Sequence, residues 1–302
     1  MVTILDGGLA TTLQAAGHDV EGHSLWSAHL LSTQPRAIVD AHAQFIEAGA
    51  DVVITASYQA SVQNLQQHLQ LSVDEAISLM KDSVTLAREA AQASGREVRV
   101  AGSVGPYGAC LGDGSEYTGN YLATMDRTAL KEWHRPRVSA LVAAGADLLA
   151  VETLPGPAEA LAVLDLLREY PNTPAWVTFS CQDSRHTCDG SSFSEAAAAV
   201  CAARPDALLA VGVNCTAPDA ALQLLSGLDR RRVPLPLVVY PNSGELWVDG
   251  RFTGDRRAEL ATMGPRYRDA GATYIGGCCR VGPDQIRGLR DALRGTGDGG
   301  KT

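Results

Sequence analysis

The stretch Ala144-Gly145-Ala146-Asp147-Leu148-Leu149-Ala150-Val151-Glu152-Thr153 has the pattern that decides the fold of this chain. A glycine that can end a helix is followed by a short apolar run, which stops at a polar residue. Related stretches occupy residues 48–55 and 270–278, and a looser copy at 204–215 begins with a proline in place of the glycine. Apolar runs of this length are typical of strands buried on both faces. The repeat therefore predicts alternating helices and parallel strands.

Counting these units gives eight strands with helical patterns between them. Eight parallel strands with intervening helices predict a (β/α)8 or TIM barrel, here a single domain over residues 1–294 followed by a flexible, glycine-rich tail at 295–302. A doubly wound open sheet is the alternative, but Asp6-Gly7-Gly8-Leu9-Ala10 lacks its G-x-G-x-x-G turn. The long segment 105–120 is expected to be a lid or binding loop over the barrel mouth. The expected strands are 3–5, 51–55, 98–103, 147–152, 175–180, 207–213, 237–240 and 273–276, and the helical patterns are 37–47, 73–93, 128–143, 157–169 and 283–293.

Composition and charge exclude several classes of function. The 302 residues carry a net charge of −9, which argues against nucleic-acid binding. No run of about 20 apolar residues predicts a membrane span, and the first residues lack the features of a signal peptide. We therefore expect a cytoplasmic protein. Its seven cysteines are an odd number in a long chain, so free thiols or metal ligands are favoured over a disulfide framework.

Three of these cysteines follow predicted strands. Cys278 and Cys279 are adjacent, after two glycines, and Cys215 ends the looser copy of the repeat. Adjacent cysteines form a disulfide with each other only under strain, whereas the mouth of a barrel brings all three together. Three thiolates with an open fourth position are typical of a catalytic Zn²⁺ site, and we expect one zinc ion per chain. The alternative is three buried thiols without a metal.

Other polar side chains are expected at the same rim. Asp6 and Glu152 are candidates for binding a substrate ammonium group, although Asp6 could instead cap the first helix. Thr55 and Asn214 either contact the substrate or satisfy local backbone groups. A second metal site formed by Cys181, His186 and Cys188 is conceivable, but ordinary loop and core thiols are favoured there.

At this point the chain resembles the homocysteine S-methyltransferases, in particular the short bacterial and plant members that use S-methylmethionine. The resemblance spans nearly the whole chain and implies a zinc-bearing TIM barrel with Cys215, Cys278 and Cys279 as zinc ligands. It also implies homocysteine contacts at Asp6, Thr55, Glu152 and Asn214. The segments that carry it are Asp6-Gly7-Gly8, Thr55-Ala56-Ser57-Tyr58-Gln59-Ala60, Val151-Glu152-Thr153, Gly212-Val213-Asn214-Cys215, Tyr240-Pro241-Asn242-Ser243-Gly244-Glu245 and Gly276-Gly277-Cys278-Cys279-Arg280.

The function expected from this resemblance is methyl transfer from a sulfonium donor, S-methylmethionine or S-adenosylmethionine, to homocysteine, giving methionine. Selenocysteine methyltransferases share the same motifs, so a selenium acceptor is an alternative. A non-catalytic zinc-binding or redox-sensing barrel is an alternative of another class, and a zinc hydrolase is disfavoured because its usual His and carboxylate ligands are absent. The expected partners are small-molecule substrates, with neither nucleic acid nor membrane, in a monomer or small homo-oligomer.

Overall fold

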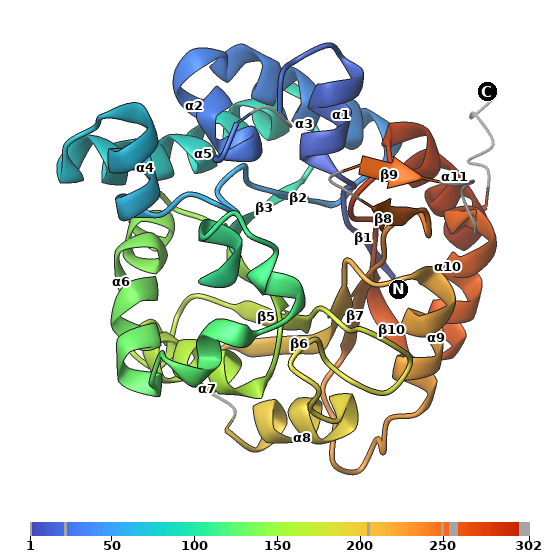
Figure 1. Ribbon diagram of the computed structural model, residues 1–302. Helices are drawn as coiled ribbons and strands as arrows, with labels where there is room; N and C mark the ends of the chain where they lie inside the picture. Colours follow the sequence, from blue (N-terminus) through green and yellow to red (C-terminus); the bar gives the residue numbers. More distant parts are fainter. Residues whose placement is uncertain (1, 21–22, 204–205, 249–250, 254–258, 296–302) are drawn as a thin grey trace, which may run out of the picture.

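The protein is a closed barrel of eight parallel strands surrounded by helices (Figure 1). This computed structural model describes residues 2–20, 23–203, 206–248, 251–253 and 259–295. The strands are ordered β1-β10-β7-β6-β5-β4-β3-β2. A parallel bridge between Leu5 and Val52 joins the two end strands and closes the ring. The predicted TIM barrel is therefore confirmed. The barrel strands are β1 (Thr3–Ile4), β2 (Val52–Ile54), β3 (Arg99–Val104), β4 (Leu148–Leu154), β5 (Ala175–Phe179), β6 (Leu208–Asn214), β7 (Leu237–Tyr240) and β10 (Ala272–Ile275).

All eight expected strands are present, with ends that differ by two residues at most. The helix expected at 73–93 has the same bounds in the structure, and Ser72 and Glu75 form a capping box at its start. Within the described ranges, no helix is long and apolar enough to span a bilayer. The α-helices are α1 (Leu9–Ala15), α2 (Leu30–Thr33), α3 (Pro35–Ala48), α4 (Val62–Leu69), α5 (Val73–Ala93), α6 (Arg127–Ala143), α7 (Pro157–Leu167), α8 (Phe193–Ala202), α9 (Pro218–Ser226), α10 (Leu260–Asp269) and α11 (Pro283–Arg294).

Several elements were not expected from the sequence. A two-stranded antiparallel hairpin, β8 (Leu246–Val248) and β9 (Arg251–Thr253), follows β7. Four short 3-10 turns lie in the loops, namely η1 (Trp26–His29), η2 (Gly108–Cys110), η3 (Ser115–Tyr117) and η4 (Asn120–Ala123). The predicted tail 295–302 lies outside the described residues from 296 onward, and the predicted domain bounds stay a prediction.

The repeated Ala-Gly-Ala-Asp phrase has a structural role at the amino-terminal ends of the strands. Gly49 and Gly145 end α3 and α6 with φ of 115° and 81°, in the left-handed region that glycine tolerates. The aspartates that follow bind the neighbouring strand. Asp51 Oδ2 accepts a hydrogen bond from Ile4 N at 2.8 Å, and Asp147 Oδ2 accepts one from Val100 N at 2.6 Å. The repeat therefore fixes strand positions at the end of the barrel opposite the mouth.

The interior of the barrel contains the large aromatic side chains of Trp176 and Tyr240 beside several alanines. Trp176 on β5 is fully buried, and Ala101, Ala150 and Ala210 line the same space. Its indole Nε1 donates to the hydroxyl of Tyr240 at 3.0 Å. This packed layer forms the floor beneath the residues at the carboxyl ends of the strands.

Candidate functional site

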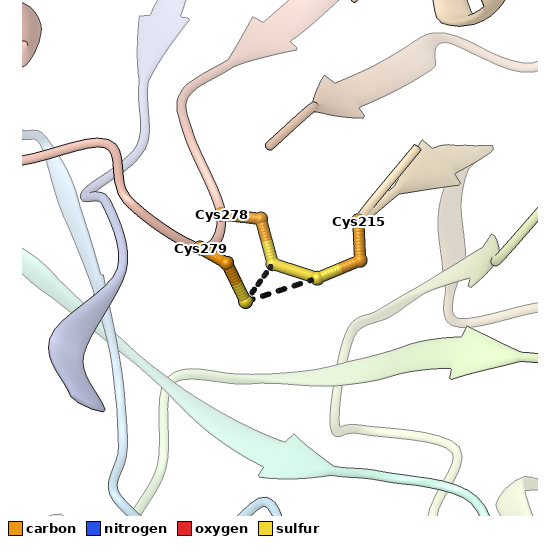
Figure 2. A group of neighbouring side chains, drawn as sticks. All are labelled: Cys215, Cys278 and Cys279. Atoms are coloured by element: carbon orange, nitrogen blue, oxygen red, sulfur yellow. Dashed lines mark hydrogen bonds between the residues drawn. A yellow bond between two sulfur atoms is a disulfide. The ribbon is translucent and has the colours of Figure 1, made fainter. Parts of the chain in front are cut away.

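The three predicted cysteine ligands meet at the carboxyl ends of β6 and β10 (Figure 2). Strand β7 lies between these two strands and holds both segments. Cys215 N donates to the carbonyl of Tyr240 at 3.1 Å, and Cys278 N donates to the carbonyl of Pro241 at 2.7 Å. The end of one strand therefore sets the distance between cysteines that are 63 positions apart in the sequence.

Two of the three sulfur atoms are joined. Cys215 and Cys278 form a disulfide, with their Cα atoms 5.5 Å apart. This differs from the expectation of free thiols, because sulfur atoms close enough to share a metal ion are also close enough to bond when oxidised. Cys279 keeps a free thiol, and burial raises its pKa to about 11. As expected, the two adjacent cysteines are not bonded to each other.

The spacing of the sulfur atoms fits a metal ion once the disulfide is reduced. Cys279 Sγ lies 3.7 Å from Cys215 Sγ and 4.0 Å from Cys278 Sγ. A tetrahedral zinc ion with Zn–S bonds of about 2.3 Å separates two sulfur ligands by about 3.8 Å. Among the described residues, this is the one group of three or more His, Cys, Asp or Glu side chains close enough to hold a metal. Cys181, His186 and Cys188 do not form such a group, so the disfavoured second site gains no support.

Two buried carboxyl groups lie near the cysteines. Glu152 on β4 accepts a hydrogen bond from Ser103 Oγ, and burial raises its pKa to about 7. Asp6 Oδ2 accepts from Ile54 N at 2.8 Å, while its Oδ1 is buried without a hydrogen-bond partner among the described residues. Burial also raises the pKa of Asp6 well above its usual range, and the two carboxyl groups repel each other. A cation is therefore the ligand that this pair can bind best.

The alternative role of Asp6 as a helix cap is wrong. Helix α1 begins at Leu9, and its N-cap residue is Gly8. The main chain of Asp6 instead ties three strands together, since its N–H donates to Val52 O and its carbonyl accepts from Gly277 N.

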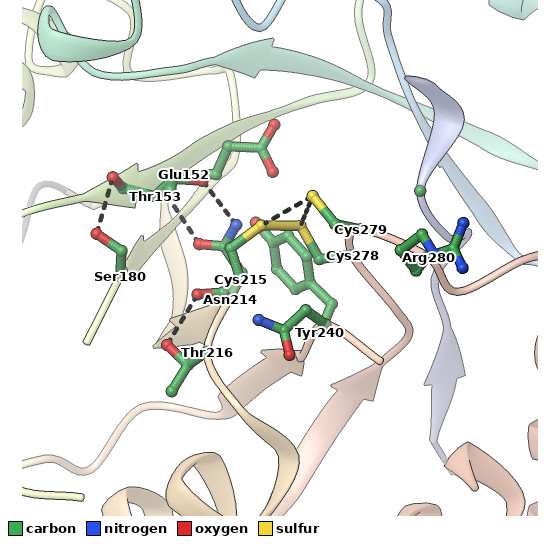
Figure 3. Close-up of a disulfide and its surroundings, with 12 residues drawn as sticks. Glu152, Thr153, Ser180, Asn214, Cys215, Thr216, Tyr240, Cys278, Cys279 and Arg280 are labelled. Atoms are coloured by element: carbon green, nitrogen blue, oxygen red, sulfur yellow. Dashed lines mark hydrogen bonds between the residues drawn. A yellow bond between two sulfur atoms is a disulfide. The ribbon is translucent and has the colours of Figure 1, made fainter. Parts of the chain in front are cut away.

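Thr55 and Asn214 are both buried and use their polar atoms within the protein. Thr55 Oγ1 accepts from Ser103 N at 2.9 Å and lies 2.7 Å from Ser57 Oγ. Asn214 bonds mainly to Thr153, which follows Glu152 on β4 (Figure 3). Its Oδ1 accepts from Thr153 N and Thr178 Oγ1, both at 2.8 Å, and its Nδ2 donates to Thr153 Oγ1 at 2.7 Å. These contacts favour the local role that the sequence left open for both residues.

Three non-glycine residues at the mouth have left-handed backbone conformations. They are Thr153, Cys215 and Arg280, with φ of 61°, 47° and 65°. Each directly follows a candidate site residue. Such conformations cost free energy and are concentrated at functional sites.

The loop predicted to cover the barrel mouth contributes Glu116, a residue that was not predicted from the sequence. In Figure 1 the green segment after β3 lies inside the ring of helices. It brings Glu116 and Tyr117 into electrostatic range of Cys279. Arg137 on α6 is buried beneath it and donates to the carbonyls of Tyr58 and Gly105. The glycine-rich loop indicated binding, but no local pattern marked Glu116 as a residue near the cysteines.

Comparison with known proteins agrees with this geometry. The family model described as homocysteine S-methyltransferase matches residues 3–293. The chain is 44% identical to the homocysteine S-methyltransferase of Escherichia coli, over 96% of this chain and 94% of that protein. It is 38% identical to a selenocysteine methyltransferase of Astragalus bisulcatus, over 96% and 92%. Crystal structures of the E. coli homocysteine methyltransferase MmuM in its metallated and oxidised forms superpose with TM-scores of 0.84 and 0.83, each at 40% identity over 96% of this chain and 95% of that one.

Proposed function

The chain belongs to the homocysteine S-methyltransferase family and is a methyltransferase, and on this premise we propose that it methylates L-homocysteine to methionine. The donor is a sulfonium compound, S-methylmethionine or S-adenosylmethionine. The observation that carries the proposal is the cluster of three cysteine sulfurs beside two buried carboxyl groups at the barrel mouth. This cluster suits an acceptor that has a thiol at one end and an ammonium group at the other.

Cys215, Cys278 and Cys279 would hold one zinc ion per chain after reduction of the disulfide. A bound zinc ion lowers the pKa of a coordinated thiol, so that the acceptor sulfur is a thiolate at neutral pH. The polypeptide keeps the three ligands in place through β7, whose residues Tyr240 and Pro241 bind the main chain of Cys215 and Cys278. These main-chain hydrogen bonds orient the cysteine ligands before a metal ion binds.

Asp6 and Glu152 bind the ammonium group of homocysteine. The unpaired Oδ1 of Asp6 supplies an acceptor, and Ser103 fixes the carboxyl group of Glu152. A nearby ammonium ion favours the ionised carboxylates and offsets the desolvation that raises their pKa values. Thr55 and Asn214 are positioning residues, because Thr55 holds Ser103 and Asn214 holds Thr153.

In the transfer step, the acceptor thiolate forms a new S–CH3 bond as the donor's S–CH3 bond breaks. The electron pair of the broken bond stays on the donor sulfur, so its positive charge disappears and the donor leaves as a thioether. The proton of the acceptor thiol is released to solvent when homocysteine binds, so no side chain has to remove one during transfer. The protein's main contribution is alignment of the two sulfur atoms and the methyl carbon.

The test is formation of methionine from homocysteine and S-methylmethionine by the reduced protein. We expect turnover that is lost on chelation and restored by zinc, and that is absent in Cys278→Ser. Cys201→Ser, on helix α8 and away from the cluster, is the matched control and should keep full activity. Turnover that persists after complete zinc removal, or in Cys278→Ser, would contradict the proposed role of the metal.

Two other functions each have one supporting observation. The relative from Astragalus bisulcatus is a selenocysteine methyltransferase, so an acceptor screen should compare homocysteine with selenocysteine. The disulfide between Cys215 and Cys278 suits a redox-sensing barrel, which predicts no zinc in freshly purified, reduced protein.

A site that works only with reduced thiols also favours the cytoplasm as its location. The assembly we propose is a monomer or a small homo-oligomer.

A further inference from the structure

The methyl donor also needs a binding site, and the inference about it rests on the proposed function. The segment over the barrel mouth is anchored rather than loose near Glu116. Ser180 Oγ, just after β5, donates to the main-chain carbonyl of Glu116 at 3.0 Å. The 3-10 turn η3 that contains Glu116 is held by Asp113 Oδ1, which accepts from Ser115 N at 2.9 Å. The position of Glu116 is therefore fixed from both the barrel and the loop.

One oxygen of the Glu116 carboxyl group lacks a hydrogen-bond partner in the part of the chain that the structure describes. Its Oε2 atom is buried and accepts no hydrogen bond there. Burial raises the pKa of this carboxyl group to about 7, and the charge of Asp113, which has the same sign, raises it further. A buried carboxylate oxygen without a hydrogen-bond donor is unfavourable, and a cationic ligand that donates a hydrogen bond to it would relieve this cost.

A second unpartnered group lies in the same space. The hydroxyl of Tyr58, after β2, is buried and makes no hydrogen bond of normal geometry with a described residue, although Thr153 lies near enough to lower its pKa. Glu116 lies within electrostatic range of this hydroxyl. Cys279 lies within electrostatic range of Glu116, which places the carboxyl group near the cysteine cluster. Glu116 therefore lies within electrostatic range of both the Tyr58 hydroxyl and Cys279.

We propose that Glu116 and the Tyr58 hydroxyl form the methyl-donor subsite and bind the ammonium group of an amino-acid sulfonium compound such as S-methylmethionine. An ammonium group supplies the N–H donors that both orphaned oxygens lack, whereas a sulfonium centre has none. A carboxylate held against the sulfonium would also stabilise the donor more than the transition state, because the positive charge disappears during transfer. Binding the ammonium end avoids this penalty.

The experiment is steady-state kinetics of Glu116→Gln with each substrate varied in turn. We expect the KM for S-methylmethionine to rise at least tenfold, while the KM for homocysteine changes less than twofold. Glu97→Gln is the matched control, since it makes the same carboxylate-to-amide change at an exposed position outside the loop over the barrel mouth. It should leave both KM values unchanged. An equal rise in both KM values, or no rise for S-methylmethionine, would overturn the assignment.

A donor without an amino group isolates the ammonium contact. With 3-(dimethylsulfonio)propionate as donor, or as competitive inhibitor if it is not turned over, we expect wild type and Glu116→Gln to differ less than twofold. A tenfold difference with this compound would place Glu116 against the sulfonium and overturn the proposal. Urea unfolding checks the fold, and the variant should be at least as stable as wild type because an unpaired buried carboxyl group is removed.

The failure of this inference is distinguishable from failure of the proposed function. If wild type forms no methionine, the proposed function fails, and calorimetric titration with S-methylmethionine still tests the subsite. Weaker binding to Glu116→Gln than to wild type would support it, and equal binding or none would refute it. If wild type is active and Glu116→Gln has unchanged kinetics, only the subsite is wrong.

Discussion

Replacing Asn214 with alanine tests whether this residue positions the site or contacts the substrate. The change removes an acceptor from Thr153 N and Thr178 Oγ1 and a donor to Thr153 Oγ1, all within a buried network. Each buried hydrogen bond contributes about 1 kcal/mol net, so we expect the free energy of unfolding to fall by about 3 kcal/mol. Thr178→Val removes one of the three bonds together with the 3.0 Å hydrogen bond between Thr178 Oγ1 and the Tyr240 hydroxyl, so it should cost about 2 kcal/mol.

The assay is urea unfolding of reduced, metal-free protein, so that metal binding does not contribute to the measured stability. Asn172→Ala, at an exposed position, is the control and should change the free energy of unfolding by less than about 0.5 kcal/mol. Zinc affinity, measured by competition with a coloured chelator, should fall about tenfold in Asn214→Ala, because Cys215 follows the lost anchor. A loss of stability below about 1 kcal/mol, together with a raised KM for homocysteine, would refute the positioning role and favour direct substrate contact.

Three other changes have definite expected outcomes. His42 on α3 is buried with both ring nitrogens unpaired among the described residues, and burial lowers its pKa from 6.5 to about 4. Because the unfolded chain binds the proton at a higher pH than the folded protein, the free energy of unfolding should fall as pH drops from 6.5 towards 4, by about 2 kcal/mol at pH 5. Urea unfolding at pH 7 and pH 5 measures this fall, and His42→Leu should lose less stability between the two pH values than wild type does. A Cβ atom at Gly212 would lie 1.8 Å from Val238 O, so Gly212→Ala should lower the melting temperature by several degrees, while Gly288→Ala, whose added carbon has ordinary contacts, should not; equal melting temperatures would contradict this reasoning. The Glu159 carboxylate accepts hydrogen bonds from Tyr107 N, Tyr121 and His134, and Glu159→Gln replaces one accepting oxygen with an NH2 group that cannot accept. A protease should therefore cut the loop at 105–120 faster in this variant, at equal global stability. An unchanged rate of cleavage would contradict the anchoring role of Glu159.

The barrel could be predicted from the sequence because the same local pattern, a helix-ending glycine followed by a short apolar run, occurs several times. The left-handed glycines after α3, α6 and α10 appear at the expected places, and each precedes a barrel strand. The three cysteines were predicted to meet because strand ends share one rim. Their disulfide was not, since the oxidation state of neighbouring sulfur atoms is not encoded in the spacing of the residues.

The parts that could not be predicted depend on contacts between distant segments. Arg137 reaches the carbonyl of Tyr58 across 79 positions of sequence. Ser180 reaches Glu116 across 64 positions. No local pattern indicates such pairs, because a loop side chain turns inward only when its neighbours in space leave room for it. The roles of Thr55 and Asn214 could not be predicted for the same reason. Their residue types fit both a positioning role and a substrate contact, and only their hydrogen-bond partners in the structure favour positioning.

The two ends of this barrel differ in how firmly the backbone is held. At one end, Asp51 and Asp147 clamp neighbouring strands, and at the other, Thr153, Cys215 and Arg280 hold conformations that raise the local energy. Fluctuations that open the molecule locally should therefore begin at the mouth and leave the opposite end intact. Substrates and metal ions can then enter and leave through brief openings of the rim, without any loosening of the barrel that carries it.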